Sequence, residues 1–347
     1  MKNQKIKTSI SCKGIVNYSI DKQKAKFYVP KAGDVAVFKV ESIGKHTAIQ
    51  SDLHRNMTIL PGDHIMASFG NRYATEQFEG YVPEECLQEF QILGMGGVVG
   101  ILKSWNSSLD KIGPTIIKII GYVVDDQGEV INTKYYHENE KAFMPSLNRG
   151  AQIILSIGSS MDSGKTTTAG FLCRGIQNLG KKVAYIKLTG TAYSKDRDFV
   201  FDCGANIVAD FSDLGFPSTY MCDKEEILNL YQGLLSKVNV LEPDYIVIEI
   251  ADGIFQRETN FLLNDPTFMS TVDGVVFSCG DSLSAIHGVQ VLKGLGIVPK
   301  ALCGVFTMSP LLIEEVQYKT EIPVFTLDHL IRAEYTELIV NLPVKSA

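Results

Sequence analysis

The chain has 347 residues, enough for two hydrophobic cores, and 45% of them are hydrophobic while 21% are charged. That composition is typical of a globular protein and excludes a largely disordered chain. The net charge of -6, with no dense tract of Lys and Arg, argues against nucleic acid as the main partner. No apolar run reaches the length of a membrane span and no signal-peptide pattern opens the chain, so we expect a cytoplasmic protein without a membrane partner.

The first part of the chain has the pattern of short strands. Residues 1–30 carry no clear signal and remain an unassigned N-terminal arm. From 31 to 148, β-branched runs such as "GDVAVFKVESIG" and "GGVVGILKSW" are closed by turn residues. This pattern predicts a small antiparallel β-barrel or sandwich, in which only "PEECLQEFQIL" has a weak helical period.

From residue 149 to 347, apolar strand-like runs alternate with amphipathic helical segments. Uniformly apolar strands that alternate with helices indicate a parallel sheet covered on both faces, so the expected class is α/β. The helices are expected at 164–179, near 198–203, and at 224–237, 282–295 and 311–319. The strands are expected within 151–158, 181–190, 205–211, 244–250, 274–280, 301–308 and 322–327. The seven cysteines are scattered and never spaced as a zinc site, which predicts buried reduced thiols.

The stretch "IGSSMDSGKTTT" follows one such strand and opens a helix. It has the spacing of a phosphate-binding loop, or P-loop, except that Ser159 takes the place of the first Gly and Gly158 stands one position earlier. In a P-loop, backbone amides and the helix N-terminus surround the phosphates, the lysine reaches the terminal phosphates and the threonine binds Mg²⁺. The predicted nucleotide-binding residues are therefore Gly158, Ser159, Ser160, Met161, Asp162, Ser163, Gly164, Lys165, Thr166 and Thr167.

A P-loop also needs an acidic residue to hold the metal, and "DYIVIEIADG" is a buried strand that ends in Glu249 and Asp252. Carboxylates at such a strand end hold Mg²⁺ in P-loop enzymes, so the predicted metal ligands are Thr166 and Glu249. The alternative is that these carboxylates only cap the next helix.

The next strand along the chain ends in Lys187, at the sheet edge where ligands bind in open α/β folds. Lys187 is a candidate for a second phosphate or an anionic substrate, or else it is a solvated lysine. In the polar segment after it, Asp196 is the candidate for orienting a nucleophile or a metal-bound water; the alternative is that each carboxylate there is a surface charge.

With these motifs in place, residues 151 to about 335 resemble the dethiobiotin synthetase-like branch of P-loop NTPases. Gly158 followed by five residues and Gly-Lys-Thr matches the loop of that family, and Lys187 in "KLTG" matches its strand-closing lysine. The strand end "IEIADG" resembles a Val-Glu-Gly-Ala-Gly-like segment, which would place Glu249 on the metal. The resemblance implies an ATP- and Mg²⁺-dependent reaction in which a substrate carboxylate or carbamate is phosphorylated.

Other features depart from that branch. Ile250 and Asp252 stand where the family has glycines. The segment "SKDRDFVFDCGA" is similar to the GTP-binding molybdopterin-guanine dinucleotide adaptor family. The two-part layout resembles an uncharacterised family in which a β-rich domain precedes a dethiobiotin synthetase-like domain.

Together these observations predict an ATP-dependent enzyme that activates a small carboxylate-bearing metabolite by phosphoryl transfer. The predicted catalytic residues are Lys165 and Lys187, which stabilise phosphoryl charge, and Asp196 and Asp252, which orient the substrate or move a proton. ATP is favoured over GTP because "VFTMSP" lacks an Asn/Thr-Lys-x-Asp motif. The alternative is a nucleotide-switched adaptor, using ATP or GTP, in which the segment 191–202 changes order. A homodimer is expected from the resemblance alone.

Overall fold

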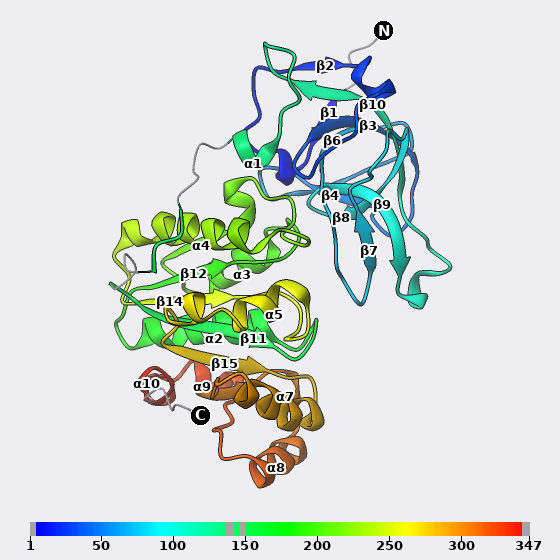
Figure 1. Cartoon of the computed structure of the whole chain (residues 1–347). Coiled ribbons are helices and arrows are strands. Elements are labelled where there is room, and N and C mark those ends of the chain that lie inside the picture. Colours follow the sequence, from blue (N-terminus) through cyan, green and yellow to red (C-terminus); the bar gives the residue numbers. More distant parts are fainter. Residues whose placement is uncertain (1–4, 137–141, 146–149, 342–347) are drawn as a thin grey trace. The chain divides into compact units, whose positions relative to one another are not determined.

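The computed structural model describes residues 5–136, 142–145 and 150–341. The chain divides into two compact units, whose elements are coloured along the sequence in Figure 1. The β-rich unit comprises residues 1–139 together with two later segments, 191–194 and 211–221. The parallel-sheet unit comprises 140–190, 195–210 and 222–347. The predicted boundary at residue 148 lies outside the described residues.

The β-rich unit is built from short strands. They are β1 (Ile6–Thr8), β2 (Ser19–Asp21), β3 (Val35–Ser42), β4 (Ala48–Gln50), β5 (Asn56–Thr58), β6 (His64–Phe69), β7 (Phe78–Tyr81), β8 (Glu89–Gly94), β9 (Val98–Trp105) and β10 (Ile116–Val124). Short 3-10 helices lie at Ile10–Cys12, Lys24–Lys26, Ser107–Leu109 and Phe211–Leu214, and the one-turn helix α1 at Thr133–Tyr136.

These strands form a closed barrel. β6 pairs with β3, β3 with β10, β10 with β8, β8 with β9, and β9 again with β6. The side chains of Phe38, Phe69 and Phe90 pack edge to face, with ring centroids 5.1 to 5.8 Å apart. This aromatic cluster forms part of a buried apolar core together with residues from several strands of the ring.

Of the two predicted arrangements, a barrel or a sandwich, the structure shows the barrel, but its strands are not all antiparallel. β6 runs parallel to β9 and to β1. A ring with an odd number of strands cannot alternate direction all the way round, so at least one neighbouring pair must be parallel. The weak helical prediction for "PEECLQEFQIL" is wrong, because most of its second half forms β8, which pairs with strands on both sides.

The parallel-sheet unit contains one sheet in the order β13-β12-β14-β11-β15-β16. Its strands are β11 (Gln152–Gly158), β12 (Val183–Lys187), β13 (Ile207–Asp210), β14 (Tyr245–Glu249), β15 (Gly274–Ser278) and β16 (Ala301–Cys303), and all neighbouring pairs are parallel. Every residue of β12, β14 and β15 is buried, so the sheet is covered on both faces, as the sequence predicted.

The helices of this unit are α2 (Lys165–Asn178), α3 (Lys195–Cys203), α4 (Lys224–Val238), α5 (Arg257–Leu263), α6 (Pro266–Met269), α7 (Ser282–Gly294), α8 (Pro310–Lys319), α9 (Leu327–Leu330) and α10 (Ala333–Asn341), with 3-10 turns at Asn239–Leu241 and Val305–Met308. The five predicted helices are confirmed, and α3 begins earlier than expected. α5, α6, α9 and α10 were not predicted. No described helix combines the length and apolar character that crossing a membrane requires.

Near the end of the chain, one predicted strand is shorter than expected and another is not formed. The run 301–308 is a strand only as far as Cys303, because Gly304 turns the backbone with a φ of +106° and a 3-10 helix follows. The run 322–327 contributes a single bridge, between Val324 and Leu302, before α9 begins.

Candidate functional site

The loop from β11 to α2 has the backbone of a phosphate cradle. Gly164 is the N-cap of α2 with a φ of +98°, and Asp162 adopts a φ of +58°. Left-handed positions at this spacing turn the chain sharply from the strand into the helix. In the described chain, no acceptor is found for the backbone amides of residues 160–164, and the buried hydroxyl of Ser163 also has no partner. The loop therefore offers several donors to an anion.

Glycines let neighbouring strand ends close against this loop. A Cβ added to Gly253, just after β14, would lie 2.4 Å from the carbonyl oxygen of Ser159. A Cβ on Gly304, just after β16, would lie 2.4 Å from the carbonyl oxygen of Ser163. Both contacts are backbone contacts, so the loop has little freedom to move away from a larger side chain.

Lys165 is buried at the first turn of α2, with 6% of its surface exposed. Its ammonium donates a hydrogen bond to the carbonyl oxygen of Ser160 at 2.7 Å, inside the loop. Burial lowers the pKa of Lys165, while the carboxylates of Glu249 and Asp252 oppose that shift. A desolvated cation in a loop of donors is suited to binding an anion such as a phosphate.

Thr166 and Glu249, the predicted metal ligands, lie side by side. β14 pairs with β11, and the hydroxyl of Thr166 donates a hydrogen bond to Oε1 of Glu249 at 2.9 Å. No cluster of three or more His, Cys, Asp or Glu side chains suited to a metal is found among the described residues. Mg²⁺ usually takes one or two carboxylates and completes its shell with phosphate oxygens and water, so this pair fits such an ion.

Tyr185 holds the other oxygen of the same carboxylate and was not predicted. Its hydroxyl donates a hydrogen bond to Oε2 of Glu249 at 2.7 Å. Burial, followed by the charge of Glu249, raises the pKa of Tyr185 well above its usual value, so the phenol remains a donor. The signal in the sequence was a tyrosine, whose hydroxyl is polar, in the otherwise apolar part of the buried strand "VAYIK". It stands two positions before Lys187 and so lies on the same face of the sheet.

Lys187 is buried between two carboxylates. It forms an ion pair with Asp196, and its Nζ lies 3.8 Å from Oε1 of Glu249. Burial alone would lower the pKa of Lys187, but Asp196 and Glu249 outweigh it and raise that pKa. Burial would in turn raise the pKa of Asp196, yet its partner Lys187 holds it below the usual value. Both groups are charged at neutral pH. Because Lys187 is only 9% exposed, it is not the solvated lysine of the alternative interpretation.

Asp252 adopts a backbone conformation that glycine favours. Its φ is +61°, in the left-handed region that glycine adopts readily and aspartate tolerates. The neighbouring amide of Ala251 donates to the hydroxyl of Thr189 at 2.8 Å, and Ile250 is fully buried. Asp252 thus places at this turn a carboxylate whose charge acts on Lys165. The structure brings together Lys165, Thr166, Lys187, Asp196, Glu249 and Asp252.

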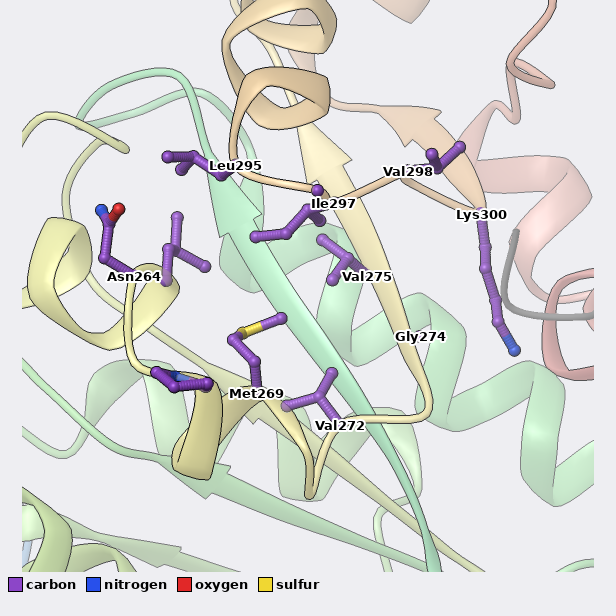
Figure 2. A pocket seen from close by; sticks show the side chains of 12 residues that line it. Asn264, Met269, Val272, Gly274, Val275, Leu295, Ile297, Val298 and Lys300 are labelled. Atoms are coloured by element: carbon purple, nitrogen blue, oxygen red, sulfur yellow. The ribbon is translucent and has the colours of Figure 1, made fainter. Parts of the chain in front are cut away.

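A cavity of about 310 Å³ lies elsewhere in the same unit (Figure 2). Its lining includes Leu263, Met269, Val275 and Ile297, and it reaches Gly274, the first residue of β15. Since the strands are parallel, the start of β15 is at the opposite edge of the sheet from the loop after β11. The lining is mainly apolar, with Asn264 and Lys300 as polar members, and its place at the start of β15 separates this cavity from the candidate site.

No protein-family model matches the chain, and no curated protein is found to match it. Among solved structures, similarity is found to the signal recognition particle receptor FtsY of Elizabethkingia anophelis in complex with GDP, with 12% identity, a TM-score of 0.38 and coverage of 57% of this chain and 69% of that one. A second structure of that receptor has 14% identity and a TM-score of 0.31, and the match covers 58% of this chain and 60% of that one.

The signal recognition particle 54 kDa protein of Aeropyrum pernix K1, in complex with GDP, is 16% identical with a TM-score of 0.35, covering 60% of this chain and 50% of that one. Similarities at this level of identity and TM-score carry no argument about activity. The geometry of the chain itself is that of a P-loop beside a Thr–Glu pair.

Proposed function

We propose that the chain is a Mg²⁺-dependent P-loop NTPase. The observation that carries the proposal is the 2.9 Å hydrogen bond between Thr166, which follows the P-loop lysine, and Glu249, at the end of the neighbouring strand. In P-loop NTPases a threonine or serine at this position and an acidic strand end are the protein ligands of Mg²⁺. The buried Lys165 beside them supplies the phosphate-binding cation.

Each group has a defined role in this proposal. The amides of 160–166 and the ammonium of Lys165 bind the β- and γ-phosphates, while Thr166 and Glu249 hold the metal. Tyr185 fixes the orientation of Glu249. When bound, Mg²⁺ neutralises charge on the phosphate oxygens. The carboxylate of Asp252 balances the charge of Lys165 while the site is empty.

For the second substrate we propose a small carboxylate-bearing metabolite. Lys187 already binds two protein carboxylates, so its ammonium can exchange Asp196 for a substrate carboxylate of the same chemistry. A carboxylate oxygen would then attack the γ-phosphorus, and the bond to the β–γ bridging oxygen would break to give an acyl phosphate and the nucleoside diphosphate. Lys187 would stabilise the negative charge on the transferred group, and the released Asp196 would orient the substrate.

ATP is the proposed nucleotide. The turn after β16 contacts the loop through Gly304 and continues with Val305 and Met308, which are 42% and 83% exposed. This segment contains no aspartate to pair with a guanine edge, whereas apolar side chains can pack on an adenine ring. The second candidate function, a nucleotide-switched adaptor using ATP or GTP, is favoured by the assignment of residues 191–194, between Lys187 and Asp196, to the β-rich unit.

The binding step is tested by the thermal midpoint of the purified chain with Mg²⁺ and either ATP or GTP. A ligand at 100 times its Kd that binds only the folded state adds about 2.7 kcal/mol of stability. We expect the midpoint to rise with ATP, to stay unchanged in Lys165→Ala and to rise normally in Lys293→Ala, which removes an exposed lysine of the same unit. A rise with GTP alone would favour the adaptor. No rise with either nucleotide would refute the proposal.

The chemical step is tested by nucleotide turnover with and without a panel of small carboxylates. Glu249→Gln should reduce turnover more than binding, because the metal ligand is weakened while the phosphate cradle stays intact. Stimulation by a carboxylate would support group transfer. Nucleotide binding without stimulated turnover would instead support the adaptor.

A further inference from the structure

Two segments of the second half of the chain belong to the β-rich unit, and each stands close in sequence to a carboxylate, Asp196 or Asp210, whose charge acts on Lys187. Residues 191–194 stand between Lys187 and Asp196. Residues 211–221 begin directly after Asp210, whose carboxylate lies 3.8 Å from the guanidinium of Arg197. The β-rich unit therefore contains the stretch that leads into Asp196 and the stretch that follows Asp210.

In the first segment, Ser194 is bound by the side chain of Gln50. The amide of Ser194 donates to Oε1 of Gln50 at 2.9 Å, and Nε2 of Gln50 donates to Oγ of Ser194 at 3.0 Å. Gln50 and Ser194 are 3% and 1% exposed. A buried amide costs stability unless its donor and acceptor are both satisfied, and Ser194 satisfies both. The neighbouring Tyr193 accepts a further bond from Asn56 at 3.1 Å.

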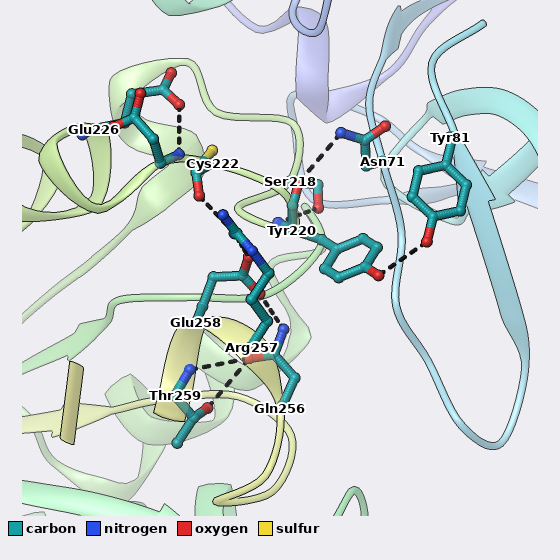
Figure 3. Close-up of polar contacts among 11 residues, drawn as sticks. Asn71, Tyr81, Ser218, Tyr220, Cys222, Glu226, Gln256, Arg257, Glu258 and Thr259 are labelled. Atoms are coloured by element: carbon teal, nitrogen blue, oxygen red, sulfur yellow. Dashed lines mark hydrogen bonds and ion pairs between the residues drawn. The ribbon is translucent and has the colours of Figure 1, made fainter. Parts of the chain in front are cut away.

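The second segment is joined to the first and to the barrel. The amide of Ala192 donates to the carbonyl oxygen of Pro217 at 2.9 Å. Figure 3 shows the hydroxyl of Tyr220 directed at the hydroxyl of Tyr81, 3.0 Å away, and the side chain of Asn71 donating to the carbonyl oxygen of Tyr220 at 3.4 Å. The two segments are thus fixed as one piece.

The residue after the second segment, Cys222, is bound by the first residue of α5. Within the parallel-sheet unit, Arg257 at the start of α5 donates to the carbonyl oxygen of Cys222 at 2.7 Å (Figure 3). One segment thus leads into Asp196, and the other ends at a residue held by the chain beyond β14.

We propose that Gln50 is a positioning residue for the phosphoryl-transfer site, acting through Ser194 on the ion pair of Asp196 with Lys187. Asp196 follows Ser194 by two residues, so fixing the position of Ser194 limits the positions that the carboxylate of Asp196 can take. Exchange of Asp196 for a substrate or phosphoryl oxygen at Lys187 then requires a defined movement of this short connection. This inference rests on the proposed function, because it assigns control of the same site to the β-rich unit.

The proposal predicts a specific kinetic signature. The phosphates are bound by the loop after β11, so the KM for the nucleotide should be nearly unaffected by changes at Gln50. A misplaced Asp196–Lys187 pair should instead slow the chemical step, since small displacements of positioned groups cost large factors in rate. A general loss of stability would lower the amount of active protein. Dividing the turnover rate by the concentration of folded protein would remove that effect.

The experiment compares Gln50→Ala, Ser194→Ala and the double variant with Gln91→Ala. Gln91 is a half-buried glutamine of the same unit that accepts a backbone bond from Leu102 at 2.9 Å and has no part in either segment. Turnover is measured with MgATP and with MgGTP, and trypsin cleavage after Lys195 and Arg197 is followed with and without each nucleotide.

We expect Gln50→Ala and Ser194→Ala each to lower kcat about tenfold with KM changed less than about twofold. The double variant should lose no more than either single variant, because both remove the same interaction. Nucleotide-dependent protection from trypsin should weaken in the same variants and persist in Gln91→Ala. Ser194→Ala provides the test if Gln50→Ala fails to fold.

Equal kcat in Gln50→Ala, Ser194→Ala and Gln91→Ala, or a loss confined to KM, would overturn the inference while the proposed function stands. If the wild-type protein neither binds nor hydrolyses either nucleotide, the proposed function fails and this inference fails with it. The two failures are therefore told apart by the wild-type measurement.

Discussion

At the scale of single residues, Lys165 combines a functional role with a cost to stability. Its ammonium is buried, and its pKa is lowered mainly by that burial, with Glu249 and Asp252 opposing the shift. The folded chain without a ligand therefore holds a charge that water would solvate better. Binding sites commonly retain such unfavourable groups because the ligand compensates them.

Replacing this lysine with an apolar side chain of similar length should stabilise the protein in the absence of nucleotide. We expect Lys165→Met to raise the thermal midpoint at pH 7 and to abolish the response to MgATP. The pKa of Lys165 is lower in the folded than in the unfolded protein. As the pH rises, the folded wild type therefore releases this proton before the unfolded chain does, and its free energy of unfolding increases. The advantage of Lys165→Met should thus shrink toward pH 10. A lower midpoint than that of Lys293→Met at pH 7 would contradict this account.

Tyr185 offers a second test at this scale. Tyr185→Phe keeps the ring and removes the hydrogen bond to Oε2 of Glu249. Partners that orient a metal ligand typically contribute about 10- to 100-fold in metal affinity, so the Mg²⁺ concentration for half-maximal turnover should rise about tenfold or more. Tyr231→Phe is the matched control. Tyr231 is also buried, and its hydroxyl forms a 2.9 Å hydrogen bond with that of Thr271, which is not part of the candidate site. The same Mg²⁺ dependence in both variants would exclude this role.

At the scale of elements, the loop after β11 depends on the strand ends beside it. Gly253→Ala would place a methyl group 2.4 Å from the carbonyl oxygen of Ser159, so the loop or the end of β14 must move. We expect nucleotide affinity to fall about tenfold or more, by isothermal titration with MgATP, because the amides lose their alignment. Gly294→Ala, where the new Cβ meets nothing within 4 Å, should bind normally. Unchanged affinity in Gly253→Ala would show that the packing is not required.

The elements of the sheet were predictable because buried parallel strands and amphipathic helices leave regular patterns in sequence. The loop could be read from its spacing, and the proximity of Thr166 to Glu249 followed from strand ends meeting at one edge. The partner of Lys187 could not be chosen among several nearby carboxylates, since each had the same local pattern. Tyr185 was missed because its hydroxyl acts across the sheet. The closing β6–β9 pair was missed because strand pairing between distant segments leaves no local signal.

At the scale of the whole molecule, the division into units does not follow the order of the chain. The β-rich unit takes its last two segments, 191–194 and 211–221, from within the sequence of the parallel-sheet unit. The glycine at position 96 shows how closely the first of them packs, since a Cβ there would lie 1.7 Å from the carbonyl oxygen of Ala192. A single cut at residue 148 would therefore leave the β-rich unit without these two segments.

Because the β-rich unit includes these two late segments, it cannot be completed until they have been translated. The barrel strands have all left the ribosome soon after β10, but their Gln50, Tyr81 and Asn71 find Ser194 and Tyr220 only when about 85 further residues beyond α1 have been made. At the usual pace of elongation that is a delay of about 4 to 17 s, during which these polar groups of the nascent barrel, among them the otherwise buried Gln50, face water. Completion of the first unit must wait for much of the second to be translated.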